Sequence, residues 1–133
     1  MMQKIDHLGI VVRDLDAAIA HWAGLLGIEA VHREVVEDQG VEVAEFPVGE
    51  SSVELITPVR DGTGIAKFLE KRGEGIHHVC YAVPDLDAEL ARLAAAGVAL
   101  IDEKPRIGAG GDLIAFLHPK STNGVLTELK QMT

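Results

Sequence analysis

The stretch that decides the fold is Gly75–Asp87, GIHHVCYAVPDLD, because it repeats Lys4–Asp16, KIDHLGIVVRDLD, from the start of the chain. When His7 is placed on His78, the Asp-Leu-Asp sequences that end the two stretches also align. Both stretches continue with apolar residues spaced four and then three positions apart, which is the spacing of one helix face. The chain is therefore predicted to be a duplication of one strand-led module.

Composition limits the class of protein. The chain has 133 residues, is 47% hydrophobic and carries a net charge of −9. This length is sufficient for one domain with its own core. The acidic balance argues against a nucleic-acid partner and against an anionic membrane surface, because both are bound chiefly by excess Lys and Arg.

The duplication predicts one domain over residues 1–133, with module one at about 4–58, a connector at 59–74 and module two at about 75–131. Cys80 is the single cysteine, so we expect no disulfide within the chain. The sequence shows neither a secretion leader nor an apolar run of about 18 residues. We therefore expect a soluble, cytoplasmic protein.

Each module is predicted to contain a strand, a helix and three further strands. Asp14 and Asp85 stand at helix N-cap positions, and Gly27 and Gly97 stand close to where these helices should end. In addition to the second opening strand, strands are predicted at 5–12, 30–37, 41–48, 52–56, 98–102, 113–117 and 124–130. In addition to the two capped helices, a helix is predicted at 65–72, and residues 103–111 are predicted to form a glycine-rich loop. The pattern predicts an α+β fold of two tandem βαβββ modules.

The two opening strands each have a bulky face and a small face. Large apolar residues alternate along one face, which suits packing against the following helix. His7 and His78 lie on the other face, beside small residues such as Gly9, Cys80 and Ala82. These small side chains leave space next to each histidine.

Four polar residues occupy equivalent places in the two modules: His7 and His78 on the opening strands, and Glu54 and Glu128 on the closing strands. If a pseudo-twofold axis relates the modules, the four side chains point into one cleft. Two imidazoles with one or two carboxylates predict a divalent metal site with open catalytic positions. Cobalt, manganese, iron, nickel or zinc suits such ligands, whereas calcium prefers oxygen alone.

The alternative interpretation of these residues is structural. A single histidine on a strand is more often a hydrogen-bonded structural residue than a ligand, and a strand glutamate is more often solvated. The matched positions favour metal ligation for His7, His78 and Glu128. For Glu54 both interpretations stay open, and His77 is interpreted as structural because it faces the other way.

Four segments together carry a resemblance to a known family. They are IDHLGIVV at 5–12, GEGIHHVCYAV at 73–83, DEKPRIGAGG at 102–111 and FLHPKSTNGVLTEL at 116–129. These segments resemble the methylmalonyl-CoA epimerase family of the vicinal oxygen chelate, or glyoxalase, superfamily, and the likeness runs along nearly the whole chain. The combination of KPRIGAGG with HPKSTNGVLTEL is the most specific part.

The resemblance implies that the paired modules form one open, barrel-like curved sheet with helices outside, usually in a homodimer. It implies an isomerase of propionate metabolism that interconverts (2R)- and (2S)-methylmalonyl-CoA. The reaction would proceed by α-proton abstraction and reprotonation through a metal-stabilised enolate, with Co2+ favoured, followed by Mn2+. The metal ligands of the family fall on His7, His78 and Glu128, and a fourth position, often glutamine in relatives, falls on Glu54.

Epimerisation requires acid/base groups on opposite sides of the reacting carbon. Glu128 is one candidate if the metal holds it loosely, and Glu54 is its alternative. For the other side, some relatives carry a glutamate at the position of Val43. Glu45 shares the strand face of Val43 and is our candidate, with water bound near the metal as the competing one.

The coenzyme A arm requires local positive charge, because the chain as a whole is acidic. Lys104 and Arg106 in the glycine-rich loop, together with Lys120 and Ser121, offer cationic groups and backbone N–H donors to a carboxylate or phosphate. The alternative interpretation is a solvated loop.

Two other functions stay open. A glyoxalase I-like lyase would use the same metal site on glutathione hemithioacetals. A metal-free small-molecule-binding module of the same superfamily would not need paired ligands, so the matched histidines and glutamates argue against it.

Overall fold

The computed structural model describes residues 1–133. Its helices and strands are β1 (Lys4–Val11), α1 (Leu15–Leu26), β2 (His32–Val36), β3 (Val41–Val48), β4 (Ser51–Pro58), α2 (Gly64–Arg72), β5 (Gly75–Val83), α3 (Leu86–Ala95), β6 (Arg106–Ile107), β7 (Leu113–Leu117) and β8 (Thr127–Gln131). Short 3-10 turns occur at η1 (Glu37–Gln39), η2 (Ala109–Gly111) and η3 (Pro119–Ser121). The predicted α+β class is confirmed.

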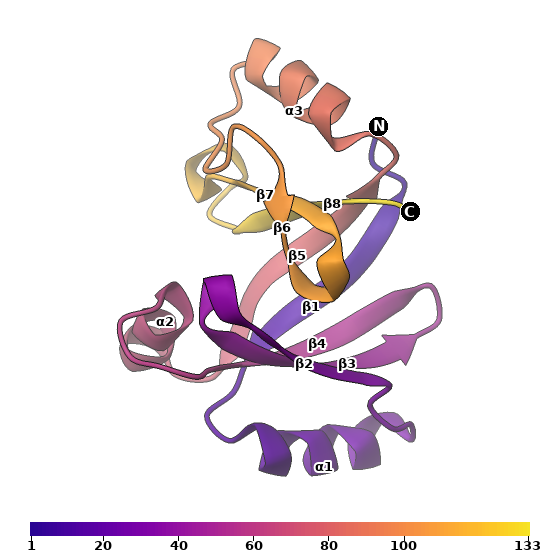
Figure 1. Ribbon diagram of the computed structural model, residues 1–133, viewed down its shortest axis with the longest axis vertical. Helices are drawn as coiled ribbons and strands as arrows, with labels where there is room; N and C mark the ends of the chain where they lie inside the picture. The colour runs from indigo at the N-terminus through magenta and orange to yellow at the C-terminus, as the bar shows by residue number, and fades with distance from the viewer. The chain divides into compact units, whose positions relative to one another are not determined.

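The chain divides into two compact units, and each is described by itself (Figure 1). We call Met1–His7 with His78–Thr133 the terminal unit, and Leu8–His77 the central unit. The division runs through β1 and β5, so each of these strands contributes one part to each unit. The single domain over 1–133 stays a prediction.

In the central unit the strands lie in the order β2-β3-β4-β1, and β3 is antiparallel to both β2 and β4. Helix α1 packs on β3 and β4, where Phe46 and Leu55 are buried in its core cluster. Because side chains alternate along a strand, Glu45 and Glu54 lie on the opposite face. These two glutamates are cross-strand partners.

In the terminal unit the order is β1-β5-β8-β7-β6, with β8 parallel to β5 and antiparallel to β7. Helix α3 lies on β7 and β8, and its Leu86 and Leu90 share a buried cluster with Leu129 of β8. The alternation predicted for β5 is confirmed, because Val83 joins this cluster while His78 is buried on the other face.

The predicted helix caps are confirmed. The Asp14 carboxylate accepts a hydrogen bond from the Ala17 N–H, and α1 ends at Gly27 with φ 70°. The Asp85 carboxylate accepts one from the Ala88 N–H at the start of α3. These contacts satisfy backbone donors that a helix leaves unpaired at its first turn.

The prediction of a strand at 98–102 is wrong. Only Leu100 forms an isolated bridge there, to Leu117, and the second module instead adds the short strand β6 within the predicted loop. The Asp102 carboxylate accepts the Phe116 N–H at 2.8 Å, and the N–H groups of Ile101 and Asp102 both donate to the Phe116 carbonyl. The Asp102 side chain thus accepts a hydrogen bond that a backbone carbonyl would accept in a regular strand pair.

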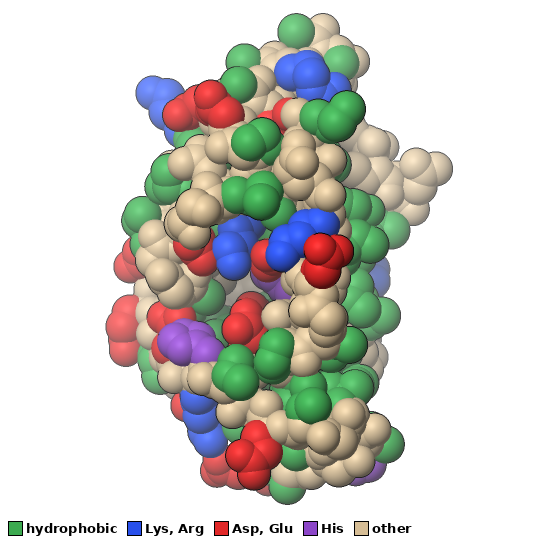
Figure 2. Space-filling model, turned by 90° about the vertical axis from the view of Figure 1, so that its right-hand side faces the viewer, with side chains coloured by type: hydrophobic (Ala, Val, Ile, Leu, Met, Phe, Trp, Pro, Cys, Tyr) green, Lys and Arg blue, Asp and Glu red, His purple; other side chains and the backbone are tan.

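On the face shown in Figure 2, Lys and Arg side chains lie among acidic and apolar ones and form no continuous basic surface. None of the helices is both long and apolar enough to cross a membrane. The cytoplasmic location stays a prediction.

We expect Leu90→Ala to lower the free energy of unfolding by about 2–5 kcal/mol, because it removes a side chain that is buried under α3. Urea unfolding followed by circular dichroism measures this change. Leu25→Ala is the control, since Leu25 is a helical leucine that is 61% exposed and its truncation should change stability by less than about 0.5 kcal/mol. Equal losses for the two variants would contradict the packing described for α3.

Candidate metal centre

Three side chains of the terminal unit converge on one point. The Nε2 atoms of His7 and His78 are 3.1 Å apart, and Oε1 of Glu128 lies 3.1 Å from the first and 3.0 Å from the second. The three residues come from β1, β5 and β8, and they are only 6%, 4% and 6% exposed. The structure therefore brings together His7, His78 and Glu128, the three residues for which the sequence favoured metal ligation.

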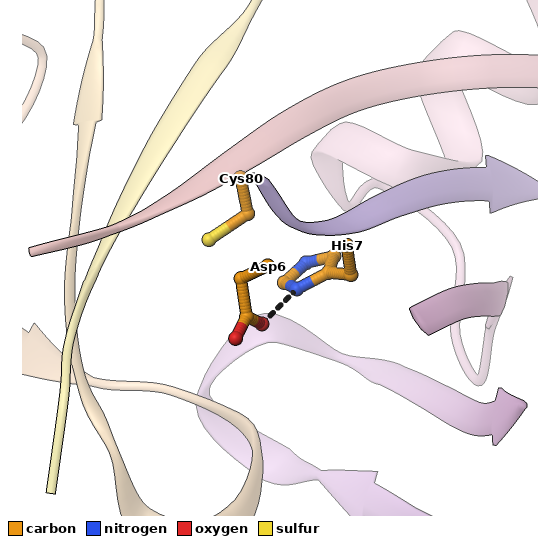
Figure 3. A group of neighbouring side chains, drawn as sticks. All are labelled: Asp6, His7 and Cys80. Carbon is orange, nitrogen blue, oxygen red and sulfur yellow. Dashed lines mark hydrogen bonds and ion pairs between the residues drawn. The ribbon is translucent and has the colours of Figure 1, made fainter. Parts of the chain in front are cut away.

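Asp6 fixes the orientation of His7. Its Oδ2 atom lies 2.8 Å from Nδ1 of His7 (Figure 3). Glu128 contacts the other ring nitrogen, Nε2. Since an ionised carboxylate can only accept, Nδ1 of His7 is the donor. In the neutral imidazole, Nε2 then carries a lone pair directed at His78 and Glu128, which is the tautomer that binds a metal through Nε2.

Phe116 supports His78. The two rings meet edge to face with centroids 5.8 Å apart, and Phe116 on β7 is the cross-strand partner of Glu128 on β8. The rings of His7 and His78 also meet edge to face, at 5.2 Å. Such contacts restrict rotation of the imidazoles, so the donor atoms stay aimed at one another.

Glu128 is held in its ionised form. Burial alone would raise the pKa of this carboxyl group, but its contacts with the His7 and His78 rings, which stabilise the carboxylate when these rings are protonated, hold the pKa far below its ordinary value. A buried carboxylate with two imidazoles needs compensating positive charge, supplied either by protons on the rings or by a cation.

The donor set fits a divalent metal. Two imidazole nitrogens and one carboxylate oxygen are ligands typical of first-row transition metals. With bonds of about 2.1 Å, one ion could contact all three donors at their separations of 3.0 to 3.1 Å.

A second group of possible ligands, formed by Asp6, His7 and Cys80, has a supporting role. The Asp6 carboxylate already accepts from His7, which accounts for its lowered pKa although burial partly opposes the shift. Burial raises the pKa of the Cys80 thiol to about 12, so this fully buried thiol stays protonated. Figure 3 shows Cys80 beside the pair.

The remaining acidic candidates lie in the central unit. Glu54 on β4 and Glu45 on β3 are half-buried partners on the sheet face opposite α1. The sequence predicts that both belong to the site. Within the central unit the two carboxylates are neighbours on adjacent strands. Their participation stays a prediction.

The candidates for binding the coenzyme A arm differ in what they already contact. Arg106 forms an ion pair with Asp102 at 3.3 Å, and its guanidinium lies 5.5 Å from the centre of the Phe116 ring. The Ser121 hydroxyl accepts the Ala99 N–H at 2.9 Å, which is a structural role. Lys104 and Lys120 are exposed.

The sequence interpretation missed Asp6, Phe116 and Lys130. Alternation places Asp6 on the opposite strand face from His7, yet its carboxylate reaches the neighbouring Nδ1. Lys130 carried a usable signal, since it stands two residues after Glu128 and so shares its strand face. Phe116 carried none, because its role depends on the β7–β8 register.

Comparison with known proteins finds relatives along the whole chain. Residues 6–116 match the family described as the Glyoxalase/Bleomycin resistance protein/Dioxygenase superfamily. The chain is 41% identical to the ethylmalonyl-CoA/methylmalonyl-CoA epimerase of Cereibacter sphaeroides, over 99% of this chain and 100% of that protein.

Two solved structures have the same fold over the whole chain. One is a variant of the Streptomyces coelicolor methylmalonyl-CoA epimerase in complex with 2-nitronate-propionyl-CoA, and the other is a methylmalonyl-CoA epimerase in complex with methylmalonyl-CoA and NH4+. Each is 39% identical to this chain, has a TM-score of 0.96, and aligns over 100% of this chain and 96% of the other.

We expect the affinity for Co2+ to fall by at least about tenfold when the pH is lowered from about 8 to about 5.5, the range in which imidazoles gain protons. The lowered pKa of Glu128 keeps this carboxylate ionised throughout, so Glu128 itself does not compete with the metal by taking up a proton. Isothermal titration calorimetry at several pH values measures the affinity for Co2+. Glu128→Gln should bind more weakly at every pH while keeping the same pH dependence. An affinity that is constant or rises on acidification would contradict the assignment.

Proposed function

The chain belongs to the Glyoxalase/Bleomycin resistance protein/Dioxygenase superfamily, and we propose that within it the protein is a metal-dependent methylmalonyl-CoA epimerase. The convergence of His7, His78 and Glu128 carries the proposal. The full-length similarity to an ethylmalonyl-CoA/methylmalonyl-CoA epimerase supports the choice of substrate. The reaction is the interconversion of the 2R and 2S epimers.

His7, His78 and Glu128 would hold the metal, with Glu54 as a fourth ligand on the basis of the repeat. Co2+ is the expected ion, with Mn2+, Ni2+, Fe2+ and Zn2+ as alternatives. When bound, the ion supplies positive charge where negative charge develops on the thioester oxygen as the α-proton leaves. Asp6 contributes by keeping Nε2 of His7 available.

Proton transfer needs a base whose pKa is not lowered as far as that of Glu128. The lowered pKa of Glu128 makes it a weak base, so we assign it to metal binding rather than to proton transfer. Glu54 and Glu45 are the remaining carboxylates, and both are half-buried on one sheet face of the central unit. Because the two stand side by side, we assign one proton transfer to this pair, with Glu54 as the candidate only if it does not bind the metal, and the opposite transfer to water near the metal.

The coenzyme A arm is assigned to cationic groups of the terminal unit. Lys104 and Lys120 are exposed and have side chains long enough to reach a phosphate. Arg106 is held by Asp102, and Ser121 by Ala99, so we assign these two residues to shaping the loops around the ligand. A homodimer is the expected assembly.

Deuterium exchange at C2 of methylmalonyl-CoA tests the function. We expect the purified protein to exchange the C2 proton with solvent deuterium and to interconvert the epimers, and a chelator to abolish both. His78→Ala should lower the rate by at least about 100-fold, because it removes a metal ligand. His77→Ala is the matched control, since His77 contacts Phe68 in the central unit instead.

Mass spectrometry and chiral analysis of the products give the readout. Exchange that survives chelation would exclude the metal mechanism. Thioester formation from methylglyoxal and glutathione, without exchange of methylmalonyl-CoA, would favour the glyoxalase-like alternative.

Glu45→Gln and Glu54→Gln test the two carboxylates separately. The variant that removes the acid/base group should still exchange the C2 proton of one epimer, through the group on the opposite side, while epimerisation falls about 100- to 10,000-fold. The other variant should epimerise within about tenfold of the unchanged protein. Full epimerisation in both variants would contradict the assignment of a proton transfer to this pair.

A further inference from the structure

Lys130 lies between two carboxylates of the terminal unit. Its Nζ atom is 3.4 Å from Oδ2 of Asp6 and 3.2 Å from Oδ2 of Asp112. Lys130 stands on β8 two residues after the ligand Glu128, so the strand directs both side chains to the same face. A single ammonium group therefore connects two acidic residues that are far apart in the sequence.

One of these carboxylates also contacts the metal centre. The Asp6 oxygen that approaches Lys130 is the same Oδ2 atom that accepts from Nδ1 of His7 at 2.8 Å. Asp112, Lys130, Asp6 and His7 thus form one continuous chain of charged contacts that ends at a metal ligand. All four residues belong to the terminal unit.

The charges of this group explain why a lysine suits the position. Asp6, Asp112 and Glu128 bring three negative charges, whereas Lys130 brings one positive charge and a divalent ion would bring two. The set is neutral only with both cations present. Without the ammonium group, Asp6 and Asp112 would face each other across the place it leaves, and their repulsion would turn Asp6 away from His7.

Asp112 connects this chain to the glycine-rich loop. It follows η2 directly, and its backbone carbonyl accepts the Gly108 N–H at 2.8 Å. Gly110 and Gly111 both have positive φ, at 71° and 79°, so the loop turns sharply just before Asp112. The ion pair of Asp112 with Lys130 therefore fixes the end of this loop to the strand that carries Glu128.

We propose that Lys130 is a positioning residue of the metal centre, which orients Asp6 toward His7 and links the glycine-rich loop to metal affinity. This inference rests on the metal-dependent function proposed above. A cavity of about 270 Å³ opens beside Lys130 and is lined by Lys4, Asp6, Asp112 and Lys130 among others, so water partly screens these charges. The effect on affinity is therefore smaller than that of a direct partner of a ligand.

The test is calorimetric titration of the full chain with Co2+. Lys130→Met should weaken Co2+ binding by about 3- to 10-fold, and Asp6→Asn by about 10- to 100-fold, the range typical of direct partners of a ligating histidine. Lys130→Arg keeps the charge and should bind within about threefold of the unchanged protein. Lys67→Met is the control, because it removes the same charge from an exposed position of α2.

Nitrogen-15 NMR of His7 without metal gives a second readout that a merely structural ion pair would not move. The unchanged protein should carry its proton on Nδ1, and Lys130→Met should shift protonation toward Nε2. If Lys130→Met unfolds, Asp112→Asn replaces it, since it loosens the same chain with a side chain of equal size; it should weaken Co2+ binding and shift the proton in the same direction.

Each of three outcomes would overturn the inference about Lys130. Unchanged Co2+ affinity and an unchanged His7 tautomer in the folded Lys130 or Asp112 variant, with tight binding by the unchanged protein, would overturn this inference alone. Loss of affinity in Lys67→Met equal to that in Lys130→Met would also overturn it, because the effect would then be general charge. Absence of Co2+ binding by the unchanged protein would overturn the proposed function and this inference together.

Discussion

The convergence of three electron-pair donors at one buried point is the constraint on which the site depends. His7 and His78 stand 71 positions apart in the sequence, yet their Nε2 atoms are 3.1 Å apart and both contact Glu128. Nitrogen lone pairs and an ionised carboxylate repel one another when they are withdrawn from water, so the arrangement needs positive charge between them. A divalent cation would supply that charge in the geometry in which the donors are held, and protons on the two rings are the alternative.

The rest of the terminal unit serves this convergence. The parallel pairing of β5 with β8 brings His78 and Glu128 onto neighbouring strands, and α3 buries the opposite face of the sheet with Leu86, Leu90 and Leu93. Asp6 then fixes the tautomer of His7, and the edge of Phe116 restrains His78. A site built on strands in this way keeps its donors in place before any ligand arrives, so little ordering is needed when one binds.

Much of this arrangement could be predicted from the sequence. The duplication gave the strand-led modules, the caps at Asp14 and Asp85, and the pairing of His7 with His78, because period-2 and helical spacing are local signals. The resemblance to the glyoxalase superfamily is confirmed. The strand expected at 98–102 failed because the Asp102 side chain replaces a backbone partner there, and no pattern of hydrophobicity records such a contact. Asp6 was missed for a similar reason. Strand alternation assigns Asp6 and His7 to opposite faces, and it does not predict that the Asp6 carboxylate reaches Nδ1 of the neighbouring His7.

The central claim is that one metal ion binds where His7, His78 and Glu128 meet. Anomalous diffraction at the cobalt edge, from crystals grown with Co2+, tests it most directly. The account predicts one strong anomalous peak per chain, at about 2.0 to 2.3 Å from both Nε2 atoms and from the Glu128 carboxylate. A peak elsewhere on the chain, or none at this point in crystals that contain bound cobalt, would contradict it.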